Sequence, residues 1–183
     1  HDWVQVTSAE HPGIPEAYGQ SVVRVPYNDP QRIIDTMKAR KVAAVILEPT
    51  LFTPPLPGYL QTLVTLCDLH GALCIFDETV MGFRWERAGG SEFFRVTPHM
   101  AVYGKALANG MPLACIVGSA QVMEGADVVS GTFGGECLSL AAAGAVLDTY
   151  SVPEPIRNQW LHGMEFQETC RRLRIPVSGY PVH

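Results

Sequence analysis

The chain has 183 residues and few of the features that mark a membrane or nucleic-acid protein. No apolar run reaches the ~18–20 residues needed to span a bilayer. No basic segment precedes an apolar stretch at the N-terminus, so we expect no signal peptide. Charged residues make up only 17% of the chain, and 13 Lys and Arg against 18 Asp and Glu leave a net charge of −5. Because phosphate contacts need a basic face, we expect no nucleic-acid partner, and we expect no membrane partner either.

Cysteine is also scarce, and its pattern is not that of a disulfide framework. There are five cysteines, an odd number, and no C-x-x-C pair. Most of them lie inside apolar runs, and the histidines are too scattered for a metal site. This usage predicts buried, reduced thiols in a cytoplasmic protein without a metal.

What the chain does have is apolar material, at 47% of its residues. That is enough for the core of one domain or slightly more, and it excludes a disordered tail. No internal repeat or low-complexity tract occurs. The first 30 residues have the Pro and Gly punctuation of loops, with one short strand predicted at 21–25. Pro30 is placed to start a helix, which the spacing of Ile33, Ile34 and Met37 carries to Arg40.

From residue 42 onward, short apolar runs alternate with helical patterns. The predicted strands are 42–47, 72–76, 100–103 and 113–117, and the predicted helices are 60–69, 138–150 and 153–174. The uninterrupted apolar run at 42–47 predicts a strand buried on both faces. Gly71 is placed to end the first of these helices. The alternation predicts an α/β fold with a mostly parallel, doubly wound sheet.

Polar side chains follow three of the predicted strands. Glu48 follows the first, Asp77 and Glu78 the second, and Lys105 the third. In a parallel sheet these positions share one edge, where ligands of such folds bind. A carboxylate and a lysine together suit pyridoxal phosphate (PLP), whose aldehyde condenses with an amine and whose ring nitrogen needs an acidic partner.

A loop at residues 130–135, Ser-Gly-Thr-Phe-Gly-Gly, precedes a helix and offers a hydroxyl and backbone N–H groups for a phosphate. Each of these features alone is weak, because most single Lys, Asp and Gly-rich loops have structural roles. From pattern alone, a nucleotide-binding α/β domain is an equal alternative. No G-x-G-x-x-G or G-x-x-x-x-G-K-[ST] follows any predicted strand, which counts against that alternative.

A series of motifs in one order narrows the choice. They are Ala43–Pro49 (AAVILEP), Gly71–Glu78 (GALCIFDE), Gly82–Arg84 (GFR), Gly89–Gly90, Val96–Pro98 (VTP) and Gly104–Pro112 (GKALANGMP). From His1 to about Tyr150 the chain closely resembles the class III aminotransferases, PLP enzymes of fold type I. The stretch around Gly-Phe-Arg and Gly-Gly-Ser-Glu-Phe-Phe looks most like the branch that contains glutamate-1-semialdehyde aminomutase.

The resemblance implies roles for four residues near the cofactor ring. Lys105 matches the lysine that bonds to the cofactor and later moves the substrate proton. Asp77 matches the partner of the pyridine nitrogen. Thr79 falls where the family usually has a Val under the ring, and Val80 falls where many transaminases have Gln and the aminomutase has Met. The Val at position 80 weakens any transfer of contacts to the ring hydroxyl.

The resemblance also implies a homodimer with shared active sites, because Gly131 and Thr132 match a Gly-Thr pair that reaches the phosphate of the neighbouring subunit. Glu48 and Glu78 match the family's Glu-Pro and Asp-Glu motifs, and hydrogen bonding within the domain is an equally good interpretation of both. Arg84 could pair with a substrate carboxylate or form a structural salt bridge. We expect His99 to be a surface residue and Trp85 to be a packing residue.

Family members are about two and a half times as long as this chain. The resemblance therefore implies that residues 1–150 are the central part of the PLP-binding large domain and residues 151–183 the start of the small domain, so that the fold is incomplete at both ends. Upstream family elements that stack on the cofactor and hold its phosphate are absent. On this interpretation, the 183 residues alone bind PLP weakly and turn over poorly.

Three functions remain open. The first is amino-group transfer between an amine, amino acid or amino sugar and a 2-oxo acid, and the second is 2,1-aminomutase exchange. Ala108-Asn109-Gly110 stands where the aminomutase commonly has three glycines, which favours the aminotransferase. The third is a catalytically incompetent domain that acts only in dimerisation. The retained Lys105 and Asp77 argue against the third function.

Overall fold

The computed structural model describes residues 6, 13–50, 52–124 and 131–183. Packing divides the chain into two compact units, His1–Arg40 and Lys41–His183, which we describe separately. The predicted division at residues 150 and 151 lies inside the second unit and remains a prediction.

The first unit holds the 3₁₀ helix η1 (Glu16–Ser21) and the helix α2 (Pro30–Ala39). The start predicted for α2 is confirmed, with Pro30 in its first turn. Asp29 precedes it, and its Oδ1 accepts a hydrogen bond of 2.9 Å from the backbone N–H of Arg32. This bond satisfies one of the N–H groups that a helix start leaves free.

The strand predicted at 21–25 is wrong. Ser21 ends η1, and residues 22–25 are extended without belonging to a sheet. Val23 is exposed, and no described strand of the first unit pairs with this segment. Apolar alternation gives a strand only where a neighbour supplies the hydrogen bonds, and here that neighbour is missing.

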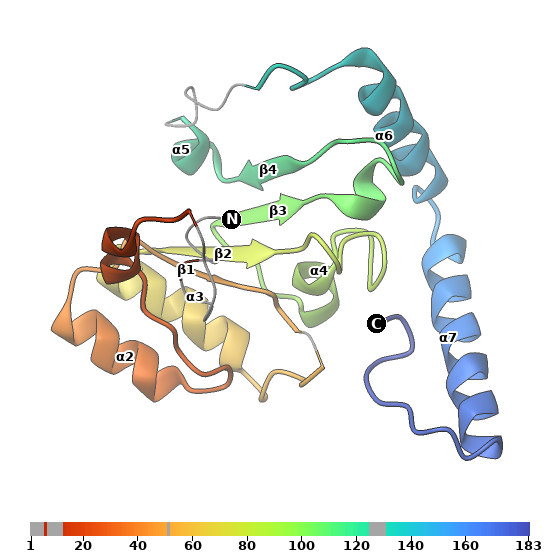
Figure 1. The fold of residues 1–183 in the computed structure, drawn as a ribbon, viewed down its shortest axis with the longest axis horizontal. Coiled ribbons are helices and arrows are strands. Elements are labelled where there is room, and N and C mark those ends of the chain that lie inside the picture. Colours follow the sequence, from red (N-terminus) through yellow and green to blue (C-terminus); the bar gives the residue numbers. More distant parts are fainter. Residues whose placement is uncertain (1–5, 7–12, 51, 125–130) are drawn as a thin grey trace. The chain divides into compact units, whose positions relative to one another are not determined.

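The second unit contains a four-stranded sheet in the order β1 (Ala44–Leu47), β2 (Leu73–Asp77), β3 (Met100–Tyr103) and β4 (Cys115–Gly118) (Figure 1). The first three strands are parallel and β4 is antiparallel to β3. All four strands lie within two residues of their predicted positions, and the sheet is mostly parallel as predicted. The segment between β3 and β4 is too short for the helical crossover that another parallel strand needs, so the chain turns back.

The helical elements of this unit are α3 (Tyr59–His70), α4 (Gly90–Phe94), η2 (Lys105–Leu107), α5 (Ala120–Met123), α6 (Cys137–Thr149) and α7 (Glu154–Arg172). As predicted, Gly71 ends α3 in the left-handed conformation, at φ 64°. The three long helices match the predicted ones within about two residues. None of the helices described is both long and apolar enough to cross a bilayer.

The two faces of the sheet differ in burial over its central strands. Cys74, Phe76 and Ala101 share a face by register and are buried. Helix α3 contacts β1 and β2 and buries Leu63 and Cys67. On the opposite face, Ile46 is 54% and Ile116 43% exposed.

The prediction that β1 is buried on both faces is therefore wrong. Hydrophobicity showed that both faces of the strand are apolar, but α3 packs on only one side. Burial of the other face needs a covering element, which the strand's own sequence does not report.

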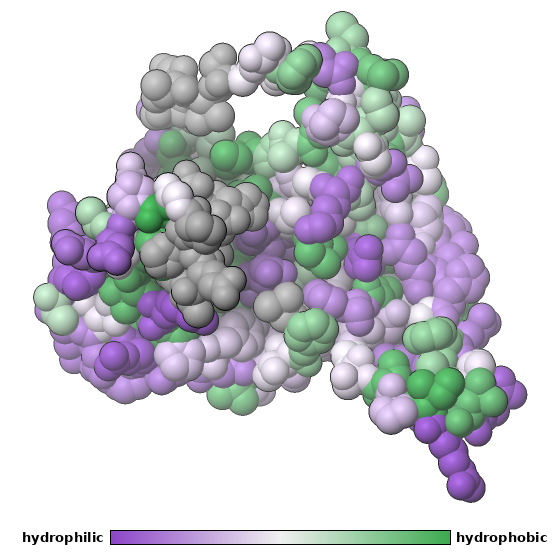
Figure 2. All heavy atoms as spheres, in the orientation of Figure 1, coloured by the Kyte–Doolittle hydropathy of each residue, from purple (hydrophilic) through white to green (hydrophobic). Residues whose placement is uncertain are grey.

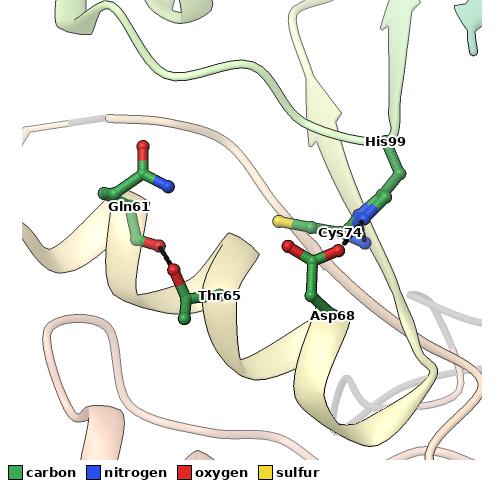
Figure 3. A network of polar contacts seen from close by, with 5 residues as sticks. All are labelled: Gln61, Thr65, Asp68, Cys74 and His99. Carbon is green, nitrogen blue, oxygen red and sulfur yellow. Dashed lines mark hydrogen bonds and ion pairs between the residues drawn. The ribbon is translucent and has the colours of Figure 1, made fainter.

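His99 joins the amino ends of two strands to α3 (Figure 3). Its Nδ1 accepts a hydrogen bond of 2.8 Å from the backbone N–H of Cys74, and its Nε2 lies 2.8 Å from Asp68 Oδ1. Its own backbone N–H donates to the Cys74 carbonyl at 2.9 Å. The prediction that His99 is a surface residue is wrong, because its side chain is only 22% exposed and is bonded at both ring nitrogens.

Trp85 is fully buried in an aromatic cluster, as expected for a packing residue. Its ring lies 4.1 Å from that of Tyr180 and 5.6 Å from that of Trp160, centroid to centroid. The indole N–H of Trp160 donates to the Trp85 carbonyl at 3.0 Å. These contacts tie α7 and the segment after it to the loop that follows β2. Trp3, also expected to pack, lies outside the described residues.

Helix α6 is apolar on nearly all sides, but only Ser139 and Ala143 in it are buried. Figure 2 shows apolar side chains gathered on its outer side, at the upper right, and more near the far end of α7. The exposed ones on α6 include Leu138, Leu140 and Leu147. Such a helix is typical of one that another element covers.

All five cysteines are free thiols. Cys67, Cys74 and Cys170 are buried as expected, whereas Cys115 is half-buried and Cys137 is exposed. Cys137 departs from the prediction because it lies in the first turn of α6, a helix that is largely uncovered.

Candidate active site

The carboxyl edge of the parallel strands brings three polar residues together. Leu47 pairs with Phe76, so Glu48 and Asp77 are the next residues along neighbouring strands. Asp77 in turn pairs with Val102, and Lys105 is the second residue after β3. The charges of Asp77 and Lys105 both act on the carboxyl group of Glu48. The predicted convergence of Glu48, Asp77 and Lys105 is thus present in the structure.

Asp77 is oriented by the turn that follows it. Its Oδ1 accepts a hydrogen bond of 3.0 Å from the backbone N–H of Thr79, two residues on. Among the described residues, no donor reaches its other carboxylate oxygen. This Asx turn leaves Oδ2 available to a ligand. The Asp-x-Thr spacing is the sequence signal from which this turn could have been predicted.

Lys105 is presented by a strained turn. It is exposed, and its φ of 43° lies in the left-handed region, which a side chain disfavours. Leu107 N–H donates to the Gly104 carbonyl at 2.9 Å, and Asn109 N–H donates to that of Lys105 at 3.1 Å. Behind the turn, Leu107 is buried in a cluster with Phe83 and Ala143. The packed turn holds the strain, a pattern common at functional positions.

Thr79 and Gly104 lie against each other at this edge. A Cβ built on Gly104 would sit 3.4 Å from Thr79 Cγ2. Thr79 therefore borders both Asp77, which it holds, and the residue before Lys105. Val80, three residues after the end of β2, is half-buried. Its predicted place near the cofactor ring remains a prediction.

Glu48 contains a buried acceptor without a partner. Its Oε2 is shielded from solvent, and none of the described residues donates to it. Burial, followed by the nearby charge of Asp77, raises the pKa of Glu48, and Lys105 lowers it. The sequence left open whether Glu48 serves the family's site or forms hydrogen bonds within the domain. The Oε2 atom forms no such bond with the described residues.

Glu78, the neighbour of Asp77 in sequence, has a structural role. It is fully buried, and its two carboxylate oxygens accept hydrogen bonds from the backbone N–H groups of Gly90 at 2.8 Å and Ser91 at 2.7 Å. Burial raises the pKa of Glu78, while these two bonds lower it. Glu78 therefore anchors the start of α4 to the end of β2.

Gly131 and Thr132 lie in an exposed turn before α6, closed by a 3.0 Å bond from Gly134 N–H to the Gly131 carbonyl. Ser130, the first residue of the loop predicted to offer a hydroxyl and N–H groups to a phosphate, lies outside the described residues. The first N–H groups of α6 are already taken, because the carboxylate of Glu136 accepts from Leu138 at 2.8 Å and Ser139 at 2.7 Å. Any anion here would therefore meet the turn rather than the helix end.

Arg84 points away from the strand-end carboxylates. Its Nη1 lies 3.5 Å from the carbonyl of Val182, at the long limit of a hydrogen bond. It lines a cavity of about 560 Å³ together with Asn109, Gln159 and His162. Neither Asp77 nor Lys105 lines that cavity, although Ala106, the residue after Lys105, does.

Comparison with known proteins identifies the family. The model of the class-III aminotransferases matches residues 9–174. The chain belongs to the class-III aminotransferase family. This confirms the resemblance read from the motifs, and with it the fold class.

Curated relatives of this class-III member include two proteins named glutamate-1-semialdehyde 2,1-aminomutase. The one from Sorangium cellulosum (strain So ce56) is 40% identical over 147 residues, covering 74% of this chain and 34% of that protein. The one from Syntrophobacter fumaroxidans (strain DSM 10017 / MPOB) is 38% identical over 183 residues, covering 91% and 42%. The chain thus spans about two fifths of the length of these relatives.

Solved structures of the same architecture include the PLP internal aldimine form of the FumI protein from Sphingopyxis sp. MTA144. It superposes with a TM-score of 0.84 at 25% identity, over 92% of this chain and 43% of that one. An omega-transaminase from Sphaerobacter thermophilus gives a TM-score of 0.83 at 24% identity, over 99% and 49%. These likenesses confirm the α/β fold of PLP-dependent transaminases for this class-III chain.

Proposed function

We propose that this chain is the cofactor-binding part of a PLP-dependent enzyme that moves an amino group. One observation carries the proposal: Lys105 and Asp77 lie at the same edge of the sheet in a member of the class-III aminotransferases. Lys105 offers an amine there, and one carboxylate oxygen of Asp77 has no described donor. We infer that the substrates are a small amine or amino acid, or an amino sugar, and a 2-oxo acid.

The side chains at this edge fit the cofactor chemically. An aldehyde needs an amine, and the exposed Lys105 supplies one without an ion pair to any described residue. A ring nitrogen that must keep its proton needs a carboxylate oxygen, and Oδ2 of Asp77 has no described donor. PLP bound here would withdraw electrons from the substrate carbon next to the transferred nitrogen.

The protein's own steps follow from these positions. Nζ of Lys105 would bond to the cofactor until a substrate amine displaced it, and the freed lysine amine would then move the proton on the substrate carbon. Asp77, whose carboxylate is held in place by the Thr79 N–H, would accept the N–H of the ring. Thr79, whose methyl group lies beside Gly104, would pack under the ring, and Val80 would lie near it.

The phosphate contacts come from a second subunit in this proposal. Gly131 and Thr132 lie in the exposed turn before α6, whereas Lys105 lies in the turn after β3. The two residues match the family's Gly-Thr pair. The uncovered apolar side of α6, which follows this turn, supports a homodimer with shared active sites. Five free thiols support a cytoplasmic location.

A second candidate is 2,1-aminomutase exchange. The relatives at 36–40% identity are named glutamate-1-semialdehyde 2,1-aminomutase, and this favours it. Ala108-Asn109-Gly110 and Val80, which depart from that branch, favour the aminotransferase. The two differ in stoichiometry, because an aminotransferase consumes a 2-oxo acid acceptor and an aminomutase needs none. Product analysis with and without added 2-oxo acid separates them.

The test of the cofactor assignment is a visible absorption spectrum after PLP is added, followed by borohydride reduction and peptide mapping. The chain has three lysines, Lys38, Lys41 and Lys105, so the site of the adduct is unambiguous. We expect a yellow species whose reduced adduct maps to Lys105 and is lost in Lys105→Ala but kept in Lys38→Ala. An adduct spread over all three lysines, or none, would contradict the assignment. The absence of any adduct would support the dimerisation-only alternative.

A further inference from the structure

Glu48 carries a carboxyl group that the proposed function does not yet use. Because Leu47 pairs with Phe76, Glu48 and Asp77 end neighbouring strands at the same edge of the sheet. The Oε2 atom of Glu48 is buried and meets no donor among the described residues. A buried acceptor without a partner carries a desolvation cost and calls for an explanation.

Two charged groups act on this carboxyl group, one from each neighbouring segment. Asp77 of β2 disfavours its ionised form, and Lys105, after β3, favours it. Helix α3, which packs on β1, places its Asp68 against His99 at the opposite end of the strands. The ionisation of Glu48 is therefore set by burial, by Asp77 and by Lys105.

The two carboxylates have different availability. One oxygen of Asp77 is occupied by the Thr79 N–H, and the other is the oxygen assigned above to the ring nitrogen. Asp77 is then committed to the ring nitrogen. Glu48 is the other carboxylate at this edge: its Oε2 has no partner among the described residues, and Lys105 is one of the charges that act on it.

We propose that Glu48 is a positioning residue for Lys105, whose carboxylate acts beside Asp77 as the counter-charge of the Lys105 nitrogen. The role of Glu48 in catalysis rests on the proposed function, whereas the first test below does not need the cofactor. Because an interaction between two charges has a single energy, it favours the charged form of both partners. Glu48 thereby keeps positive charge at the lysine nitrogen while Asp77 serves the ring.

The first test needs no cofactor. The carboxyl carbon of Glu48 is followed by NMR against pH in protein labelled with ¹³C-glutamate, with Glu48→Gln providing the assignment. We expect its titration midpoint to rise in Lys105→Ala and to fall in Asp77→Asn, each by about one pH unit or less. Lys41→Ala is the matched control, because Lys41 is an exposed lysine three residues before the other end of β1. A midpoint unchanged by Lys105→Ala would overturn the proposal.

The second test uses the PLP-loaded protein. The pH at which the visible band of the Lys105-bound cofactor changes should fall in Glu48→Gln, by about one unit or less, because a nearby negative charge has been lost. Glu48→Asp keeps the charge and should stay near the wild type. Glu124→Gln makes the same exchange at an exposed residue that ends α5, beyond β4, and should match the wild type.

The outcomes separate the two proposals. If the wild-type protein forms no adduct on Lys105 but Lys105→Ala still moves the Glu48 titration, the proposed function fails and the charge coupling stands. If the adduct forms and Glu48→Gln titrates like the wild type, the assignment of Glu48 fails and the function stands. Should Glu48→Gln not fold, the NMR titration in the Lys105→Ala and Asp77→Asn proteins, with Glu48 intact, still decides the question.

Discussion

The Nδ1 atom of His99 accepts a hydrogen bond of 2.8 Å from the backbone N–H of Cys74. Since a ring nitrogen that accepts carries no proton, the proton of the neutral ring is on Nε2, which faces Asp68. The side chain thus links the first residues of β2 and β3 to α3, at the edge of the sheet opposite to the candidate active site.

Replacing His99 should therefore cost stability without touching the site. In His99→Leu the buried N–H of Cys74 loses its acceptor, and we expect the free energy of unfolding to fall by about 1–3 kcal/mol. His99→Asn retains an acceptor and should recover part of the loss. Urea unfolding measures all three proteins, with the exposed His70→Leu as control. A loss as large in His70→Leu would show that the bond is not the cause.

Two glycines should respond in opposite ways to alanine. Gly89 has a φ of 71°, and a Cβ there would overlap the Glu78 carboxylate, so Gly89→Ala should destabilise the protein and loosen α4. Gly144 lies inside α6 with open space around its Cα, so Gly144→Ala should stabilise it by up to about 1 kcal/mol. Thermal unfolding of both variants checks the pair. Equal shifts of the same sign would contradict the prediction.

Glu48 should make stability depend on pH. Burial and Asp77 raise the pKa of Glu48 in the folded protein, so the folded state takes up its proton more readily than the unfolded chain does. The stabilising effect of that proton is complete below the ordinary glutamate range and is lost as the pH rises through the folded pKa.

Glu48→Gln cannot titrate, so its unfolding free energy minus that of the wild type should be largest at neutral pH and shrink as the pH falls toward about 4.5. Urea unfolding at a series of pH values measures this difference, with Glu124→Gln as the matched exchange at an exposed position. A difference that grows on acidification would have the wrong sign and would refute the assignment.

Trp85 should be the most costly single side chain to remove. It is fully buried, and its ring contacts Tyr180 and Trp160, so Trp85→Ala should lose about 3–5 kcal/mol of stability. Because these rings tie down the segment after α7, limited proteolysis should cleave between Ile175 and His183 first. Phe166→Ala, at an exposed position of α7, should leave both stability and the cleavage pattern nearly unchanged.

The strands and the strand-end residues were predictable because their signals are local. Four apolar runs of strand length gave the sheet, and the first polar residues after them gave Glu48, Asp77 and Lys105. What failed depended on partners distant in sequence. Residues 21–25 are rich in valine, as strands are, but have no described neighbour to pair with. Strand β1 is apolar on both faces but is covered by α3 on only one.

The same limit explains the side-chain roles that the sequence did not reveal. The structural role of His99 could not be predicted, because the Cys74 N–H that it accepts from lies 25 residues away in the chain. The sequence left two interpretations of Glu78 open, and the hydrogen bonds that its carboxylate accepts from Gly90 and Ser91, 12 and 13 residues away, decide for the structural one. The roles of Lys105, Asp77, Thr79, Val80, Gly131 and Thr132 toward a cofactor remain predictions.

Because β3 pairs antiparallel with β4, the number of residues between the two strands affects the position of Lys105. Tyr103 pairs with Cys115, and the turn that carries Lys105 closes this pair. An insertion or deletion of one residue in that turn would slip the register, and a one-residue slip exchanges the two faces of a strand. The length of this segment should therefore be constrained in addition to the identity of Lys105, which it carries.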